Sequence, residues 1–247
     1  MTGIVKAAGG SFSRELGIGL DAGQPRDIFR WFLASVLFGA RISETIVKHT
    51  VRAFEEAGVT APEVIEQTGW DGLVAILDRG GYVRYDFKTA TKLLDLSRTL
   101  RSQYQGDLNR LHAAAAGSRD LEGRLKSLAK GIGDVTVNIF LREMRGTWPK
   151  ASPLPPVPVI LAAANLGLLP QGMRDRDEAL AGLLRFWEGE GGSFRDFADL
   201  EAALLRIGKN FCRKGACSAC PVRQSCRRPQ RRQGRKGTRP HRAARGN

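Results

Sequence analysis

The chain has 247 residues, of which 42% are hydrophobic and 26% are charged, a composition typical of a globular protein. It has no apolar run long enough for a membrane span, and its first ten residues are too short and weakly apolar for a secretory signal, so we expect a cytoplasmic protein without a membrane partner. The 39 Lys and Arg outnumber the 25 Asp and Glu, and the net charge of +14 favours a polyanionic partner.

The first half of the chain has helical hydrophobic spacing, with apolar residues recurring every three or four positions. The helices expected there are "DIFRWFLASVLFGA" starting near Pro25, "ETIVKHTVRAFEEAG" ending at Gly58, a short helix opening at Pro62, "DFKTATKLLDLSRTLRSQY", a segment from about Arg119 to Leu128, and a segment after Gly133.

A proline-rich stretch, "WPKASPLPPVPV", divides these helices from the rest of the chain. Five prolines in ten residues exclude a helix interior, so the stretch is predicted to be a linker or a stiff crossing segment. Helical spacing resumes in "VILAAANLGLL", "RDEALAGLLRFWEG" and "FADLEAALLRIG". Because no alternating strand pattern is present, we predict an all-α protein of about ten helices.

A two-glycine turn, Gly131-Ile132-Gly133, separates two of the predicted helices. Glycines on both sides of one apolar residue allow a sharp turn, with Ile132 pointing inward, and leave backbone N–H groups bare beside a helix N-terminus. This geometry suits a phosphate group, although a plain helix–turn–helix connection has the same pattern.

The hairpin and its neighbourhood resemble the helix–hairpin–helix base-excision DNA glycosylases, specifically the endonuclease III-like branch. The resemblance covers about residues 25–226 and rests on "LKSLAKGIGDVTVNIFLREMRG", "FLASVLFGARISE", "GGYVRYDFKTATKL" and "EAALLRIGKNFCRKGACSACPVRQSC". It implies a two-lobed fold, double-stranded DNA as the partner, and recognition of a damaged or distorted duplex. We expect a monomer associated with the nucleoid.

All four cysteines lie between residues 212 and 226, with the spacing C-x4-C-x2-C-x5-C. Disulfides are disfavoured in a reducing cytoplasm. A 4Fe–4S cluster suits four thiolates on one short loop better than zinc does, although zinc remains the alternative. The first gap is two residues shorter than the family's usual one. The expected ligands are Cys212, Cys217, Cys220 and Cys226. The cluster would shape a basic loop whose Arg213 and Lys214 contact phosphates.

The residues that carry catalysis in the family are not matched. The position of its nucleophilic lysine holds Val135, and no Asp or Glu occurs between Glu143 and Asp175, where its catalytic aspartate is expected. A glycosylase with relocated groups, for which Asp134, Glu143 and Lys150 are weak candidates, therefore competes with a catalytically inactive DNA-binding or lesion-sensing protein. If the protein is active, a monofunctional N-glycosylase is favoured over a lyase. An unrelated helical metalloprotein that binds nucleic acid, including RNA, is a third reading.

Base extrusion in the family leaves a hole in the duplex that a side chain must fill. Arg41 matches the position of one such side chain, with contact to a phosphate as the alternative. Tyr82 and Tyr85 lie where the second wedge loop is expected, and either would stack on a base.

The sequence thus predicts three parts. A six-helix lobe spans residues 25–148 and carries the hairpin. Residues 1–24 together with 149–226 form the cluster lobe. Residues 227–247, with nine Lys and Arg and no acidic residue, form a disordered basic tail suited to phosphate backbones.

Overall fold

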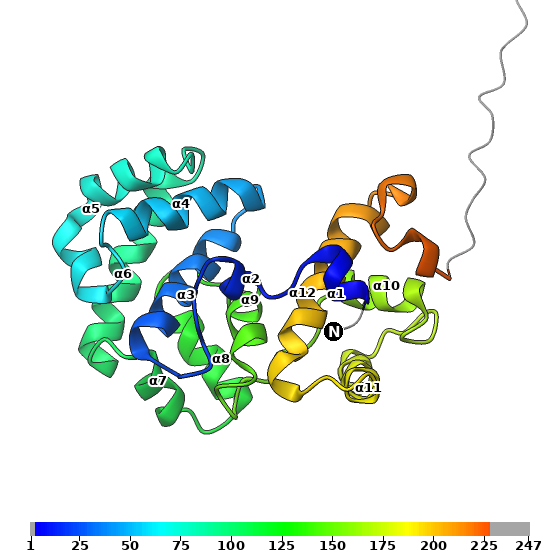
Figure 1. Cartoon of the computed structure of the whole chain (residues 1–247). Coiled ribbons are helices and arrows are strands. Elements are labelled where there is room, and N and C mark those ends of the chain that lie inside the picture. The colour runs from blue at the N-terminus through cyan, green and yellow to red at the C-terminus, as the bar shows by residue number, and fades with distance from the viewer. Residues whose placement is uncertain (1–2, 228–247) are drawn as a thin grey trace, which may run out of the picture.

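The computed structural model describes residues 3–227; the predicted basic tail beyond Arg227 lies outside the described residues. Within residues 3–227 the chain forms twelve α-helices and no strand, which confirms the all-α prediction. Figure 1 shows the helices in two groups, with α3–α9 in one lobe and α1, α10, α11 and α12 in the other.

The α-helices are α1 (Gly3–Ala8), α2 (Phe12–Glu15), α3 (Pro25–Phe38), α4 (Glu44–Glu56), α5 (Pro62–Arg79), α6 (Asp86–Tyr104), α7 (Leu108–Ala114), α8 (Ser118–Ser127), α9 (Asp134–Met144), α10 (Val157–Leu166), α11 (Arg176–Gly189) and α12 (Phe197–Ile207). The 3-10 helix η1 (Phe194–Asp196) lies between α11 and α12. After α12 come the π-helix η2 (Gly208–Cys212) and the 3-10 helices η3 (Cys217–Ala219) and η4 (Arg223–Ser225).

Local signals explain where several helices begin. Proline occupies the first turn of α3 and α5. Backbone N–H groups in the first turn have no acceptor within the helix, so the absence of one in proline costs no hydrogen bond there. Ser43 caps α4 by accepting the N–H of Ile46 at 3.3 Å. The helix from Pro62 is longer than predicted, because α5 continues through a kink at Gly69, whose φ of 69° favours glycine. The sequence prediction also missed α1, α2 and α7, which are too short to show a period.

The buried hydrophobic side chains form two clusters. The first contains most of the core of α3–α9, and the second contains the core of α10–α12. The first lobe therefore has seven α-helices rather than six. The N-terminal segment is divided between the clusters, since Val5 packs in the second whereas Phe12, Ile18 and Leu20 pack in the first. This corrects the prediction that residues 1–24 belong to the cluster lobe alone.

Buried charges join α9 to α12 between the two lobes. The Arg145 guanidinium donates from Nε and Nη2 to the Glu201 carboxylate at 2.9 and 3.2 Å, and both side chains are almost fully buried. Asp199, also on α12, accepts the N–H of Ser11 at 2.8 Å and the guanidinium of Arg14 at 2.7 Å. A buried ion pair of this kind costs desolvation free energy, so removing one partner alone leaves an uncompensated charge.

The proline-rich segment crosses between the lobes in an extended form. Its carbonyl groups accept hydrogen bonds from both sides: the amide of Asn138 donates to Leu154 at 2.8 Å, and Arg176 donates to Leu154 and Pro155 at 2.9 and 3.0 Å. Arg145 donates to the carbonyl of Pro153. These bonds fix the segment against α9 and α11. Among the described residues, no helix combines the length and apolar character that a bilayer crossing requires.

Candidate nucleic-acid interface and metal centre

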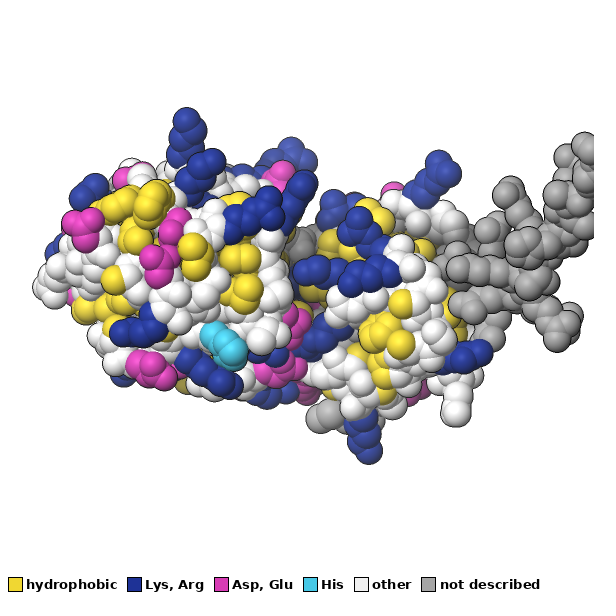
Figure 2. All heavy atoms as spheres, turned by 90° about the horizontal axis from the view of Figure 1, so that it is seen from above, with side chains coloured by type: hydrophobic (Ala, Val, Ile, Leu, Met, Phe, Trp, Pro, Cys, Tyr) yellow, Lys and Arg dark blue, Asp and Glu magenta, His cyan; other side chains and the backbone are white. Residues whose placement is uncertain are grey.

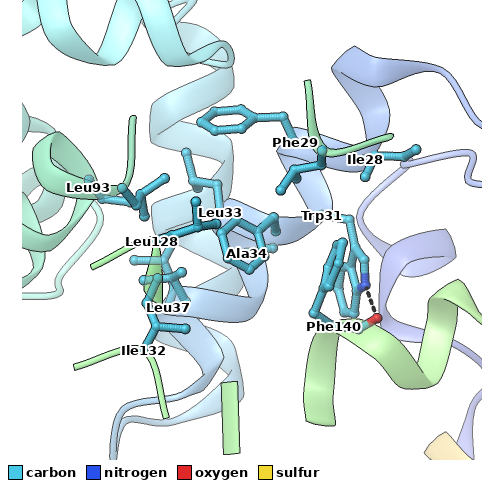
Figure 3. Close-up of a cluster of buried hydrophobic side chains, with 14 of the residues drawn as sticks. Ile28, Phe29, Trp31, Leu33, Ala34, Leu37, Leu93, Leu128, Ile132 and Phe140 are labelled. Atoms are coloured by element: carbon cyan, nitrogen blue, oxygen red, sulfur yellow. Dashed lines mark hydrogen bonds between the residues drawn. The ribbon is translucent and has the colours of Figure 1, made fainter. Parts of the chain in front are cut away.

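The turn at residues 131–133 joins α8 to α9 as a tight hairpin. Gly131 has a φ of 91°, a left-handed conformation that an L side chain adopts only with strain. Ile132 is buried, and Figure 3 shows it beside Leu37 and Leu128. Gly131 and Gly133 are both exposed, and Gly133 is the N-cap of α9 without a side chain to cover the N–H groups that follow. The buried Ile132 side chain thus anchors the hairpin in the core, while the two glycines remain exposed to solvent.

The charge at the start of α9 is balanced locally. Asp134 is the first residue of the helix rather than its N-cap, and its carboxylate forms an ion pair with Lys126 on α8. This ammonium group lowers the pKa of the Asp134 carboxyl. The side chain is 88% exposed, so the pair contributes little to stability and can rearrange when an anion approaches. The position therefore gives Asp134 a role at the helix terminus and no partner that would make it a general base.

Arg41 lies on the exposed turn between α3 and α4. This turn packs closely on the first turn of α9, because a Cβ built on Gly39 would lie 2.2 Å from Oγ1 of Thr136. The predicted hole-filling residue and the hairpin are therefore on neighbouring elements.

The expectation that Tyr82 stacks on a base is wrong. Its ring is fully buried in the first core cluster, and its hydroxyl donates to the carbonyl of Leu37 at 2.7 Å. Burial also raises the pKa of the phenol. Tyr82 therefore holds the turn after α5 against α3, and Tyr85 is half-buried beneath Arg84.

Two exposed aromatic side chains close to this turn escaped the sequence prediction. Trp70 on α5 and Phe87 on α6 are 38% and 58% exposed, and their ring centroids lie 5.1 Å apart. The Trp70 indole N–H donates to Thr91 at 3.1 Å, which fixes the ring over α6. Exposed rings held in place are suited to stacking on bases. In the sequence, only the glycine at position 69, directly before Trp70, marks this point of the helix.

Two of the weak catalytic candidates have structural partners instead. The buried Glu143 carboxylate accepts the N–H groups of Phe12 and Ser13, each at 2.8 Å, and so caps α2. The Lys150 ammonium donates to the carbonyls of His112 and Ala113 at 2.8 and 3.2 Å. Because their charged groups are engaged within the fold, the structure removes both from the candidates. Val135, at the position of the family's lysine, is 63% exposed.

The four cysteines lie on the loop after α12. Cys212 ends the π-helix, Cys217 opens η3, and both Cys220 and Cys226 close 3-10 turns. All four are free thiols rather than disulfides. Burial raises the pKa of the Cys212 thiol. Cys212, Cys220 and Cys226 all pack against the second hydrophobic cluster.

Their arrangement in the structure is nonetheless not that of a formed metal site. No group of three or more His, Cys, Asp or Glu side chains in residues 3–227 is placed to hold a metal ion. The number and type of these side chains suit a four-thiolate cluster or zinc.

The loop that contains the four cysteines, residues 212–226 (the cysteine loop), has exposed basic side chains. Arg213 and Lys214 are exposed, as is Lys209 on the π-helix, which the sequence prediction did not include. Figure 2 shows Lys and Arg side chains on both sides of the boundary between the lobes and along one edge of the molecule. A basic surface shared by both lobes is the electrostatic signature expected of a nucleic-acid interface.

No family model matches the chain, and no curated protein is significantly similar to it.

Proposed function

We propose that this protein binds damaged or distorted double-stranded DNA as a helix–hairpin–helix protein of the base-excision-repair type. The observation that carries the proposal is the hairpin at residues 131–133, which exposes glycine N–H groups at the start of α9 while Ile132 anchors it in the core. A sugar–phosphate backbone can approach this turn closely because no side chain covers it.

The surroundings of the hairpin supply the other contacts that duplex recognition needs. Arg41 lies on the turn that packs against α9, and Lys130 directly precedes the hairpin. Trp70 and Phe87 offer rings for stacking on an extruded or unpaired base. In the second lobe, Arg213 and Lys214 would hold the same duplex by its phosphates.

Base removal is a separate question from binding. The exposed Val135 cannot act as a nucleophile or a base, and Glu143 and Lys150 are engaged elsewhere. Base removal by this protein would therefore need non-standard catalytic residues, and a catalytically inactive DNA-binding or lesion-sensing protein is the alternative.

Replacing Gly131 by alanine is expected to weaken duplex binding about tenfold, which corresponds to about 1.4 kcal/mol. The methyl group would strain the backbone at φ 91° and would lie 3.1 Å from Cε of Lys92, so the hairpin would have to shift. Binding of the full chain to duplexes with one abasic site, one mismatch or no defect can be followed by fluorescence anisotropy at several salt concentrations.

Gly172→Ala is the matched control, because Gly172 has a φ of 80° and open space around it, in the second lobe. It carries the same backbone strain and should leave the affinity unchanged. Equal losses in the two variants, or no preference of the native protein for any duplex, would contradict the proposal.

We also propose that Cys212, Cys217, Cys220 and Cys226 hold a 4Fe–4S cluster, with zinc as the alternative, because four thiolates within one short loop match its ligand set. When bound, the cluster would cross-link the loop and hold its basic side chains in place.

Anaerobically purified protein is expected to be brown with about four iron atoms per chain. Cys217→Ser should lose most of the iron, whereas Ser218→Ala should retain it. Elemental analysis that finds zinc in place of iron would select the alternative, and no metal in the native protein would refute both.

A further inference from the structure

Arg142 is a buried cation that no carboxylate of the described chain contacts. The residue is 3% exposed and lies near the end of α9, the helix that meets α12 at the boundary between the lobes (Figure 1). Within residues 3–227 it forms no ion pair, and its one hydrogen bond is a long one, from Nε to the carbonyl of Asn138 at 3.4 Å in the same helix. The two terminal nitrogens, Nη1 and Nη2, therefore have no partner in this part of the chain.

The other buried charged side chains of residues 3–227 all have partners. Glu143 accepts two backbone N–H groups, and Asp199 accepts a backbone N–H and a guanidinium. Arg145 and Glu201 form an ion pair. Arg145 is the closest comparison, because it lies less than one turn further along the same helix and is equally buried, yet it donates to both oxygens of a carboxylate. Arg142 is thus the exception among these buried charges.

Burial without a partner is unfavourable for this residue. A guanidinium stays protonated in proteins, so it cannot avoid the desolvation cost by becoming neutral. Burial lowers the pKa of Arg142, and the charges of Arg145 and Arg206 act in the same direction. Glu201 and Glu143 oppose this shift from a distance, but neither forms an ion pair with Arg142. An anion in direct contact with the guanidinium would reduce this cost.

The terminal nitrogens of Arg142 can be reached from solvent. In residues 3–227, the fully buried side-chain nitrogen and oxygen atoms without a hydrogen bond belong to Glu66, Ser97, His112 and Arg206. Nη1 and Nη2 of Arg142 also lack a hydrogen bond but are not fully buried, so the small exposed part of this residue includes the tip of its guanidinium. So small an exposed area suits a free or terminal anionic group better than a phosphodiester with a sugar on each side.

We propose that Arg142 binds a phosphate group with at most one ester bond, either inorganic phosphate or the terminal phosphate of a nucleic-acid strand, at the junction between the lobes. Two neighbouring N–H donors of a guanidinium match two oxygens of a phosphate group, and their opposite charges strengthen the hydrogen bonds. The net charge of +14 favours a phosphate-bearing partner. The hairpin precedes the first turn of α9, whereas Arg142 lies in its last turn, so the two contacts are distinct.

Isothermal titration calorimetry of the full chain with inorganic phosphate, at constant ionic strength in chloride buffer, tests the proposal. The native protein is expected to bind one phosphate per chain, and Arg142→Met should weaken this binding about ten- to one-hundredfold, the usual effect of losing hydrogen bonds between charged groups. Arg142→Lys keeps the charge but loses the paired donors, so its affinity should be intermediate. Arg110→Met, which removes an exposed arginine of α7, should bind like the native protein. No saturable site, or equal affinity of the native protein and Arg142→Met, would overturn the proposal.

A second measurement does not depend on the folding of any variant. Crystals of the native protein soaked in tungstate, an electron-dense analogue of phosphate, are expected to show an anomalous peak within hydrogen-bond distance of Arg142. Tungstate bound only at other arginines or lysines would refute the assignment of the site to this residue.

Nicked duplexes with a 5′-phosphate, a 3′-phosphate or only hydroxyl groups at the nick distinguish the two sources of phosphate. Tighter binding of one phosphorylated nick, lost in Arg142→Met, identifies a strand end as the ligand. Equal binding of the three duplexes, together with saturable binding of inorganic phosphate, identifies free phosphate. The inference goes beyond the proposed function, because a protein that binds phosphate at Arg142 but no duplex would refute the proposed function and leave this inference standing.

Discussion

Replacing Glu201 by glutamine is expected to reduce the free energy of unfolding by about 3–5 kcal/mol. The substitution keeps the shape of the side chain but removes the negative charge that faces Arg145, and both side chains are buried between α9 and α12. Arg145 would then be a buried cation with the carbonyl of Pro153 and a neutral amide as its partners. Thermal or urea denaturation monitored by circular dichroism measures the loss.

Two further variants test whether the loss of the buried charge pair causes the lower stability of Glu201→Gln. Glu188→Gln changes an exposed glutamate on α11 and should alter stability by no more than about 0.5 kcal/mol. The double variant Arg145→Met and Glu201→Met removes both charges and should recover much of the lost stability, because the desolvation cost disappears with them. If Glu201→Gln were as stable as the native protein, the ion pair would not hold the lobes together.

Replacing Gly208 by alanine is expected to destabilise the second lobe by about 3 kcal/mol or more. A Cβ on this residue would lie 1.9 Å from the carbonyl oxygen of Pro158 and 2.6 Å from its carbon, so the backbone of α10 would have to move away from the π-helix. Because the π-helix ends at Cys212, the displacement should also lower the iron content if the proposed 4Fe–4S cluster is bound.

Gly123→Ala provides the comparison for Gly208→Ala. Gly123 lies within α8 with open space around its Cα, so alanine there should stabilise the helix by about 0.5–1 kcal/mol. Opposite signs for the same substitution would show that close packing, rather than helix propensity, determines the effect at residue 208. A stable, metal-replete Gly208→Ala protein would contradict the close contact with α10.

The shared interface between the lobes connects these expectations to function. DNA that contacts both the hairpin and the cysteine loop requires these two elements to keep a fixed relative position. That position depends on the Arg145–Glu201 pair and on the crossing segment that Asn138 and Arg176 hold. Variants that loosen this junction should weaken binding to duplex DNA even though the changed residues are buried. Substitutions at the junction and at the hairpin can be told apart, because only the former also lower stability strongly.

Much of the architecture follows from the sequence because it depends on local patterns. The period of apolar residues predicts α3, α4, α6 and α9 close to their observed bounds, and proline residues mark the first turns of α3 and α5. The glycines around Ile132 predict a tight turn with an inward isoleucine, which the structure shows. Charge and cysteine spacing likewise are properties of the sequence, although the partner and the metal that they favour remain proposals.

Only the tertiary structure decides which polar and aromatic side chains are available to a ligand. Tyr82 and Phe87 are close in sequence, yet the first is buried against α3 and the second is exposed beside Trp70. Glu143 and Lys150 find their partners in segments far along the chain, as does Lys92 with Gly131. Such contacts arise when helices pack, and residue spacing within one helix carries no information about the helix that will face it.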